Sequence, residues 1–446
     1  MSRDREFSFV RANLTKLLAA PMYLLGMLLA LVVPRNRQQW VFGSGIGVAE
    51  GALVLARELR HEDPEAKIFW AVADDAEAAI ASSEGLEPVL RSGWAGFRVT
   101  LRSRYAIVTH GLGDVNRFGV SGARIIHLGH GAPLKKLHLD SPVTTAVRGP
   151  AFARAILLRM YRSGARRVWM YVAGSVTAAE RLRSAYRVEP GRVRVLGDAR
   201  DDGLAQQALH TGSAAADASA AASAAASTDV RRLLGLSPDQ AAEPLGLYAP
   251  TWRDGGPDPA APDADEAAAI HRAMEALGAH LVIRSHPLGA GAYEAATGAR
   301  VHLLGADVVR DITPHLGAFD TVITDYSSLA IDFSLLGRPI VWFAPDLEAY
   351  AATRALRAAR GDCGGACRAQ LGGGAQAALR GARRRSASTR RPDRGPGARG
   401  TFPHTPRGRC SEEGARRDPP PRPEARGAHT RRGPLLRELL RAPGRV

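Results

Sequence analysis

The chain has 446 residues and is 45% hydrophobic, which suffices for two ordinary domains with real cores and excludes a wholly disordered protein. The formal net charge of +16 comes from residues 351–446, which hold 23 arginines, no lysine and 7 acidic residues. Residues 1–350 are therefore neutral and contain none of the 3 cysteines. This composition excludes a disulfide framework in the body of the protein and gives no indication of nucleic-acid binding there.

A charge-free apolar run of 17 residues, Leu17–Val33, lies between basic flanks near the N-terminus. As a helix it would reach roughly 25 Å at about 1.5 Å per residue, slightly less than a bilayer core of about 30 Å. We interpret residues 1–37 as a membrane-associating segment, monotopic or marginally spanning, whose basic flanks suit anionic headgroups at the cytoplasmic face of the membrane. A buried helix and a signal peptide are the alternatives.

Residues 38–210, here called the first block, alternate short apolar runs with helical periods. Strands are expected in 40–45, 67–75, 105–110, 123–130, 168–175 and 192–198, and helices in 48–60 and much of 151–187. Asp74 and Asp75 are expected at the end of a strand. Such alternation predicts a parallel, doubly wound sheet, and thus a Rossmann-like domain.

Residues 211–230 are rich in alanine and serine and of low complexity, so we interpret them as a linker. Residues 231–353, the second block, again alternate. Strands are expected within 245–255 and 280–288 and up to Thr324, with helices at 264–277 and from about Ser327. The sequence therefore predicts an α/β protein with two Rossmann-like domains that face each other across a cleft.

Residues 354–446 are rich in arginine, glycine and proline and show no apolar period, which is typical of a disordered basic tail. The presence of arginine without lysine favours a second interpretation, in which a GC-rich gene is read out of frame. In that case the second domain would be incomplete.

A histidine between two glycines, in the run Gly129-His130-Gly131, follows a predicted strand. The glycines allow a tight turn and the close approach of a substrate. Imidazole titrates near neutral pH, so His130 is a candidate general base for an attacking hydroxyl group. Lys135 and Lys136 follow closely and would neutralise a phosphate, although one of them can equally be an ordinary surface lysine.

Groups that bind anions follow three predicted strands of the second block. They are Thr251 and Arg253, then Arg284 and His286, and finally Asp325, Ser327 and Ser328. The two serines would begin a helix, where free N–H groups favour an anion, but they could also act as simple caps. Arg253 could also form a surface ion pair instead of binding phosphate. With His130, this set predicts displacement at phosphorus, with positioning and positive charge supplied by the protein.

Five motifs in order resemble those of the CDP-glycerol glycerophosphotransferases, the teichoic-acid-type poly(glycerol phosphate) primases and polymerases. The motifs are HGAPLKK, LGDARDD, YAPTWRD, RSHP and ITDYSSLAIDFSLLGRPIVWFAPDLEAY, between Trp40 and Tyr350. The resemblance implies a GT-B architecture and a monotopic membrane enzyme with CDP-glycerol as donor. It also implies transfer of glycerol phosphate to a hydroxyl of a lipid-linked or polymeric acceptor, release of CMP, and a teichoic-acid-like or capsular product.

The resemblance also implies roles for single residues. His130 becomes the general base, and His286 and Arg253 lie near the donor diphosphate, where they stabilise the charge on departing CMP. Ser327 and Ser328 form the diphosphate cradle, in a loop shaped by Asp325 and Tyr326. Arg200 and Asp202 fall on a motif near the domain junction and have supporting roles.

Two other functions stay open at this point. One is a GT-B glycosyltransferase with another nucleotide donor, and the other is a catalytically disabled protein that binds anions or nucleic acid through its tail. The glycine run at 43–47 lacks the dinucleotide-binding spacing, and no metal-ligand pattern stands out, so no obligatory cofactor or metal is expected.

Overall fold

A computed structural model describes residues 13, 18–141, 144–146, 151–209, 228–251, 253, 258–285, 293–348 and 350. Contacts divide the chain into two compact units, Met1–Arg384 and Arg385–Val446, and every described residue lies in the first. The predicted tail, most of the predicted linker and His286 lie outside the described residues. Residues 228–230, at the end of the predicted linker, are helical, and Val230 is buried in the core of the second block.

The first block forms a sheet of seven parallel strands in the order β3-β2-β1-β4-β5-β6-β7. Its strands are β1 (Asn36–Phe42), β2 (Lys67–Val72), β3 (Glu87–Leu90), β4 (Ser103–Val108), β5 (Arg124–His127), β6 (Val168–Ala173) and β7 (Val193–Val195). Residues 40–42 and 106–108 are buried without alternation, as expected for central parallel strands covered on both faces. The predicted parallel sheet is confirmed.

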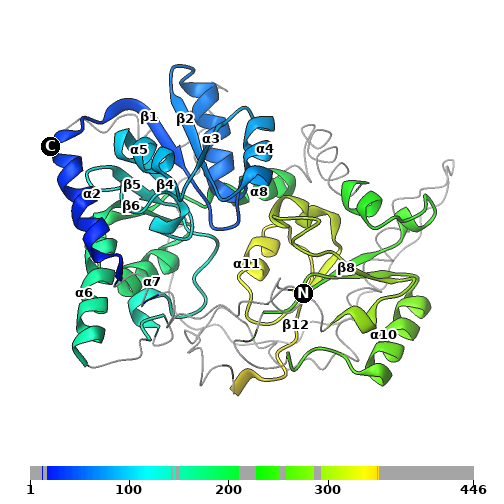
Figure 1. Cartoon of the computed structure of the whole chain (residues 1–446). Coiled ribbons are helices and arrows are strands. Elements are labelled where there is room, and N and C mark those ends of the chain that lie inside the picture. Colours follow the sequence, from blue (N-terminus) through cyan, green and yellow to red (C-terminus); the bar gives the residue numbers. More distant parts are fainter. Residues whose placement is uncertain are drawn as a thin grey trace, which may run out of the picture. The chain divides into compact units, whose positions relative to one another are not determined.

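Six α-helices of the first block lie within the described residues. They are α3 (Glu50–Glu62), α4 (Asp75–Ser83), α5 (Trp94–Arg102), α6 (Ala151–Arg167), α7 (Val176–Tyr186) and α8 (Asp202–Leu209). Figure 1 shows α3, α4 and α5 close to β1, β2 and β4. Helix α3 buries Ala52, Leu55 and Leu59, which its helical period places on one face. Asp74 caps α4 by accepting a hydrogen bond from the N–H of Glu77 at 2.9 Å.

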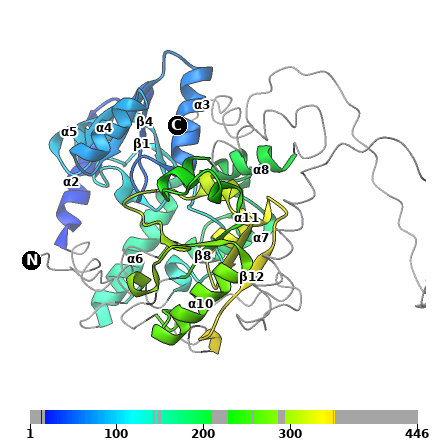
Figure 2. The same ribbon diagram turned by 90° about the vertical axis from the view of Figure 1, so that its right-hand side faces the viewer.

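The second block forms a sheet of five parallel strands in the order β10-β9-β8-β11-β12. Its elements are β8 (Leu245–Ala249), α10 (Ala264–Leu277), β9 (His280–Ile283), β10 (Val301–Leu303), β11 (Thr321–Thr324), α11 (Leu329–Ser334) and β12 (Ile340–Trp342). Figure 2 shows α10 beside β8 and β12, and Met274 and Leu277 of this helix share one buried cluster with Leu281 and Ile283 of β9. Helix α10 has the predicted bounds because a capping box begins it and Gly278, in the left-handed conformation, ends it.

Both sheets reverse their strand order beside their first strand, between β1 and β4 and between β8 and β11. Loops that leave the carboxyl ends of such strand pairs diverge, and ligands of doubly wound proteins bind there. Segments 43–49 and 109–118 leave the first switch point, and segments 250–253 and 325–328 leave the second. The second switch point therefore holds five of the predicted site residues, Thr251, Arg253, Asp325, Ser327 and Ser328, whereas His130 follows β5.

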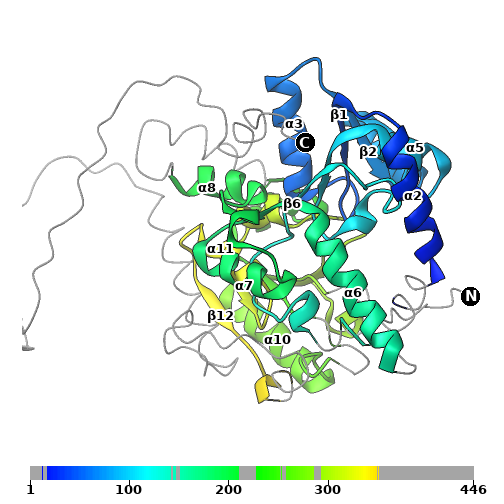
Figure 3. The same cartoon turned by 90° about the vertical axis from the view of Figure 1, so that its left-hand side faces the viewer.

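Helix α2 (Ala20–Val32) lies beside α5 (Figures 1 and 3). A Cβ atom on Gly26 would lie 2.0 Å from the carbonyl oxygen of Phe118, so only glycine allows this packing. An apolar cavity of about 480 Å³ separates parts of α2 and α5, while Leu24, Leu28 and Leu31 are 61%, 63% and 82% exposed. None of the helices in the described ranges combines the length and the hydrophobicity that crossing a bilayer requires.

Candidate active site

His130 lies in a tight turn that follows β5. Gly129 and Gly131 have φ angles of 81° and 113°, which glycine adopts without strain. His130 Nδ1 lies 3.4 Å from the carbonyl oxygen of Thr109. Because a carbonyl only accepts hydrogen bonds, the neutral ring carries its proton on Nδ1 and leaves Nε2 free to accept one. The turn thus presents a histidine in the tautomer that a general base requires.

His110, at the carboxyl end of β4, stacks on His130 with ring centroids 4.1 Å apart and planes 6° apart. His110 Nδ1 accepts a hydrogen bond from the N–H of Gly45 at 3.2 Å. Asp114 accepts three successive backbone N–H groups, beginning with that of Thr109, and so fixes the loop. Enclosure by protein and the neighbouring His110 lower the pKa of His130, although its side chain still reaches solvent. His130 is therefore neutral and competent as a base near pH 7.

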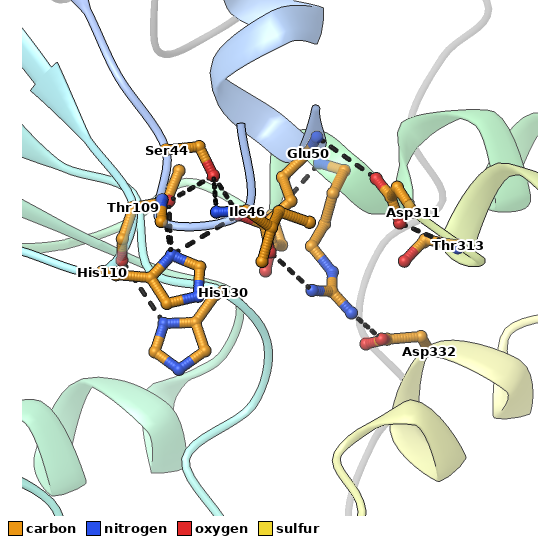
Figure 4. Close-up of polar contacts among 12 residues, drawn as sticks. Ser44, Ile46, Glu50, Thr109, His110, His130, Asp311, Thr313 and Asp332 are labelled. Atoms are coloured by element: carbon orange, nitrogen blue, oxygen red, sulfur yellow. Dashed lines mark hydrogen bonds and ion pairs between the residues drawn. The ribbon is translucent and has the colours of Figure 1, made fainter. Parts of the chain in front are cut away.

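Glu50 begins α3 and places a buried carboxylate beside the two histidines (Figure 4). Ser44 donates a hydrogen bond to Glu50 Oε2 at 2.8 Å, and His110 Nδ1 lies 3.7 Å from the same oxygen. The N–H of Glu50 donates to Asp311 of the second block at 3.2 Å. Burial raises the pKa of Glu50, and the hydrogen bond from Ser44 opposes that rise. Arg200 Nη1 lies 3.7 Å from Oε1 of the same carboxylate.

Arg200 joins the two blocks. It lies in a short 3-10 helix, Ala199–Asp201, and pairs with Asp332 of α11 as well as with Glu50. Burial alone would lower the pKa of Arg200, but the surrounding carboxylates hold it above its usual range. The predicted position near the domain junction therefore agrees with the contacts of Arg200. Asp202, by contrast, is exposed at the first turn of α8.

Ser328 meets the turn that carries His130. A Cβ atom on Gly131 would lie 2.9 Å from Ser328 Oγ and 3.5 Å from the guanidinium carbon of Arg200. Ser328 is the N-cap residue of α11 but makes no side-chain capping hydrogen bond, while Ser327 Oγ accepts one from the N–H of Leu329 at 3.3 Å. The contact at Gly131 brings the general-base candidate and one serine of the predicted cradle together.

Arg253 is buried between aromatic rings and carboxylates. It pairs with Asp325 at 2.9 Å and bidentately with Asp346 at 2.8 Å, and its guanidinium carbon lies 5.1 Å and 4.8 Å from the ring centres of Tyr326 and Tyr350. These contacts use most of its five N–H donors. The ion pair considered as an alternative is thus present, although it is buried rather than on the surface. Binding of phosphate by Arg253 stays a prediction.

The remaining candidate residues lie around this centre. Lys135 Nζ lies 5.6 Å from the ring centre of Tyr350, whereas Lys136 is exposed. Thr251 donates its N–H to Asp325 at 2.9 Å. Arg284 donates to three backbone carbonyls of residues 304–310 and thereby holds the loop that precedes Asp311.

Several residues of this centre were not predicted from the sequence, among them His110, Glu50, Asp311 and Asp332. His110 ends a predicted strand, which was a usable signal for a site residue. Glu50 stands inside a predicted helix, and nothing in its sequence neighbourhood indicates a buried carboxylate. Within the described ranges, no group of three His, Cys, Asp or Glu side chains could hold a metal ion.

Comparisons with known proteins identify a protein family for this chain. The family model described as CDP-Glycerol:Poly(glycerophosphate) glycerophosphotransferase matches residues 26–358. The chain belongs to this family. The resemblance inferred from the five motifs is therefore confirmed.

A curated relative is the teichoic acid poly(glycerol phosphate) polymerase of Staphylococcus epidermidis, which is 28% identical over 235 residues. The match covers 50% of this chain but only 28% of that protein. A structure of the wall teichoic acid polymerase TagF is similar with a TM-score of 0.57 at 20% identity, and covers 78% of this chain and 81% of that chain. A TagF variant soaked with CDPG matches with a TM-score of 0.54 at 20% identity over 72% and 73% of the two chains. At these identities the likeness of the structures shows the fold.

Proposed function

We propose that this protein transfers glycerol phosphate from CDP-glycerol to a hydroxyl group of a lipid-linked or polymeric acceptor, with release of CMP. The observation that carries the proposal is the placement of His130 in a chain of this family. Its Nδ1 faces the carbonyl of Thr109, and its turn contacts Ser328 of the other block. The product is a teichoic-acid-like or capsular polymer of the cell envelope.

The reaction is a displacement at phosphorus. The acceptor oxygen attacks the phosphorus that carries glycerol, and a new O–P bond forms while the bond from this phosphorus to the bridging oxygen of CMP breaks. His130 Nε2 takes the proton of the attacking hydroxyl. CMP leaves with the electron pair and the negative charge, so positive groups and N–H donors around the donor diphosphate lower the barrier.

The donor diphosphate lies beside the loop 325–328 of the second block in this proposal. Ser327 and Ser328 supply hydroxyl groups, and the predicted ligands His286 and Lys135 supply positive charge or hydrogen bonds. Asp325 and Arg253 hold the loop in shape, which the buried pair between them at 2.9 Å supports. Arg284 does not bind the donor directly in this proposal, but holds the 304–310 loop through hydrogen bonds to its backbone carbonyls.

We further propose that the protein works at the cytoplasmic face of the membrane as a peripheral or monotopic protein. The apolar outer surface of α2 supports this location, because Leu24, Leu28 and Leu31 expose large apolar side chains side by side on the helix. Arg37 follows the helix, is exposed and suits anionic headgroups, whereas the guanidinium of Arg35 donates to the backbone carbonyls of Thr100, Ser103, Gly119 and Ser121.

The decisive experiment measures CMP release from CDP-glycerol by the full chain in the presence of a lipid-linked acceptor. A His130→Ala variant is expected to lose at least about 100-fold in rate, since general-base catalysis contributes roughly 10²–10⁴-fold. His61→Ala changes an exposed histidine of α3 and serves as the control. Equal rates for all three proteins would refute the role of His130, and release of a nucleotide only from another donor would favour a glycosyltransferase.

The proposed location has its own test in sedimentation with vesicles that contain anionic phospholipid. Replacement of Leu28 by Asp should release the protein from the vesicles, because a charge would have to enter the apolar layer. Leu233→Asp alters an exposed leucine of the second block and should leave binding unchanged. Equal sedimentation of both variants and the unaltered protein would contradict attachment through α2.

A further inference from the structure

We propose that Glu50 is the positioning residue of His130, and that contacts from the second block complete its placement. The inference rests on the proposed function, since it assigns to His130 a partner in the transfer reaction. It goes beyond that function because it names the residue that connects the histidine of the first block to side chains of the second block. Glu50 touches neither the predicted cradle nor the turn at Gly131 by any described hydrogen bond, so it would act through its neighbours.

On the side of the first block, Glu50 completes a chain of polar contacts that ends at the imidazole pair. Ser44 donates to the carboxylate at 2.8 Å and accepts from Thr109 Oγ1 at 3.0 Å. The carbonyl of Thr109 is the acceptor that faces His130 Nδ1, and His110 stacks on His130. Loss of the carboxylate therefore loosens the group that sets the tautomer of His130.

On the side of the second block, two aspartates hold Glu50 and its ion-pair partner. Asp311 accepts the N–H of Glu50 at 3.2 Å and also the N–H of Thr313 at 2.9 Å, so the aspartate itself is fixed by its own loop. Asp332 pairs with Arg200, whose other amino group lies 3.7 Å from the Glu50 carboxylate. Figure 4 shows these contacts extending from His130 to Asp332.

The backbone of Glu50 supports the same conclusion. Its φ angle is +60°, a left-handed conformation that a glutamate keeps only where the surroundings enforce it. A glycine would relieve this strain, and a glycine does follow at position 51, yet position 50 carries a carboxylate. The strain is offset by the hydrogen bond to Asp311 and by the contacts of the side chain. We infer that the function of the protein requires a carboxylate at position 50, even though the backbone there is strained.

Electrostatics favour the same role. The titratable groups around His130 are His110 and Asp114 in the loop after β4, His127 in β5, Arg200 and Glu50. Enclosure by protein, His110 and Arg200 lower the pKa of His130, and Glu50 raises it. A general base gains a proton in the transition state, so the carboxylate stabilises the imidazolium that forms.

The test is histidine NMR on the full chain, with ring-labelled histidine and the His130 signal assigned from a His130→Asn variant. Glu50→Gln keeps the shape and the acceptor for Ser44 but removes the charge. Asp311→Ala removes the acceptor supplied by the second block. Glu77→Gln is the matched control, because Glu77 also pairs across the blocks, with Arg310 at 2.9 Å, but has no described contact with either stacked histidine.

In Glu50→Gln we expect the titration midpoint of His130 to move to lower pH, and kcat for CMP release to fall about tenfold or more with little change in the KM of the donor. Asp311→Ala should also move the titration midpoint of His130 to lower pH, whereas Glu77→Gln should leave this midpoint unchanged. An unchanged midpoint in Glu50→Gln, or an equal change in Glu77→Gln, would overturn the proposal. An unchanged titration midpoint of His130 in Asp311→Ala would overturn the claim that the second block helps to place His130.

The NMR measurement needs no activity, so it separates this proposal from the proposed function. A shifted His130 midpoint in a chain that releases no CMP would contradict the transferase reaction and leave the positioning role standing. Because Glu50 is buried, thermal unfolding of each variant accompanies the titration. If Glu50→Gln does not fold, Ser44→Ala takes its place with the same expected direction, because it removes the hydroxyl that donates to the carboxylate and accepts from Thr109.

Discussion

The rings of His110 and His130 lie 4.1 Å apart and within 6° of parallel, although the two residues follow different strands, β4 and β5. Two imidazole rings at this distance cannot both be protonated to imidazolium cations without strong repulsion. Burial and the neighbouring His110 ring keep His130 neutral, and its tautomer is set by the carbonyl of Thr109. We therefore assign the role of general base to His130, and to His110 the role of a neighbour that lowers the pKa of His130.

Replacement of His110 by Phe should raise the pKa of His130, because a flat ring stays in the stack while the neighbouring charge that lowers this pKa disappears. We expect the acid limb of the pH profile of kcat for CMP release to move to higher pH. The pH dependence is measured between about pH 3 and 8 with the unaltered protein beside it, so that the range includes the pKa of about 4 to which burial lowers His130. An acid limb at the same pH in both proteins would show that His110 does not affect the pKa of His130.

Gly131→Ala and Gly129→Ala form a matched pair in the His130 turn. Both glycines have positive φ angles, but only at position 131 would a Cβ atom lie 2.9 Å from Ser328 Oγ, whereas position 129 has nothing within 4 Å. Both variants should lose about 1 kcal/mol of stability from backbone strain. Gly131→Ala should in addition raise the KM for CDP-glycerol several-fold, because Ser328 must move. Equal kinetic effects of the two changes would argue against contact between the turn and the donor loop.

Arg253→Lys should destabilise the protein by about 3 kcal/mol, since lysine cannot reproduce the bidentate pair with Asp346 together with the pair to Asp325. The free energy of unfolding is measured in urea on the full chain. Arg232→Lys alters an exposed pair with Asp229, in which the arginine is 76% exposed, and should change stability by less than about 0.5 kcal/mol. A small effect at Arg253 would mean that its carboxylate partners are well solvated.

His127 should make the protein sensitive to acid. It is fully enclosed, and burial lowers its pKa to about 3, well below the usual value of 6.5. Between these two pH values the unfolded chain binds a proton at this site that the folded protein does not, so stability falls as the pH falls from 6.5 toward 3. The contribution is about 1.36 kcal/mol per pH unit.

His127→Phe removes the titrating group and keeps an aromatic ring against Tyr171 and Tyr186, whose ring centres lie 5.3 Å and 5.6 Å from that of His127. Its unfolding free energy should therefore depend less steeply on pH, by about one proton, between roughly pH 4.5 and 6.5. Burial raises the pKa of Asp198 to about 6 and of Asp201 to about 7, and these groups act in the opposite direction in both proteins. Parallel stability curves for the two proteins would contradict a neutral, buried His127.

Local sequence patterns predicted the regular elements well. Helix α10 spans Ala264–Leu277 as expected, and β11 ends at Thr324 as expected. Hydrophobic periods and caps are local, so the chain carries this information within a few residues. The same holds for His130, because a Gly-His-Gly turn after a strand is visible without any tertiary contact.

Tertiary structure decided which strand ends meet. Glu50, His110 and Asp332 lie far apart in the sequence and come together through the placement of β1 beside β4 and the contacts of α11 with Arg200. It also assigned Arg253 to a buried ion pair and left Lys136 exposed, where the sequence allowed either role for these side chains.

The sequence alone thus determined the family, the parallel α/β sheets and the histidine of the candidate site, because strand, turn and motif are encoded locally. Only the tertiary structure decided the partners of that histidine. Strand order and the burial of charge depend on contacts between segments of the chain that local patterns do not specify. The positive φ of Glu50, held by Asp311 from the other block, is the clearest case.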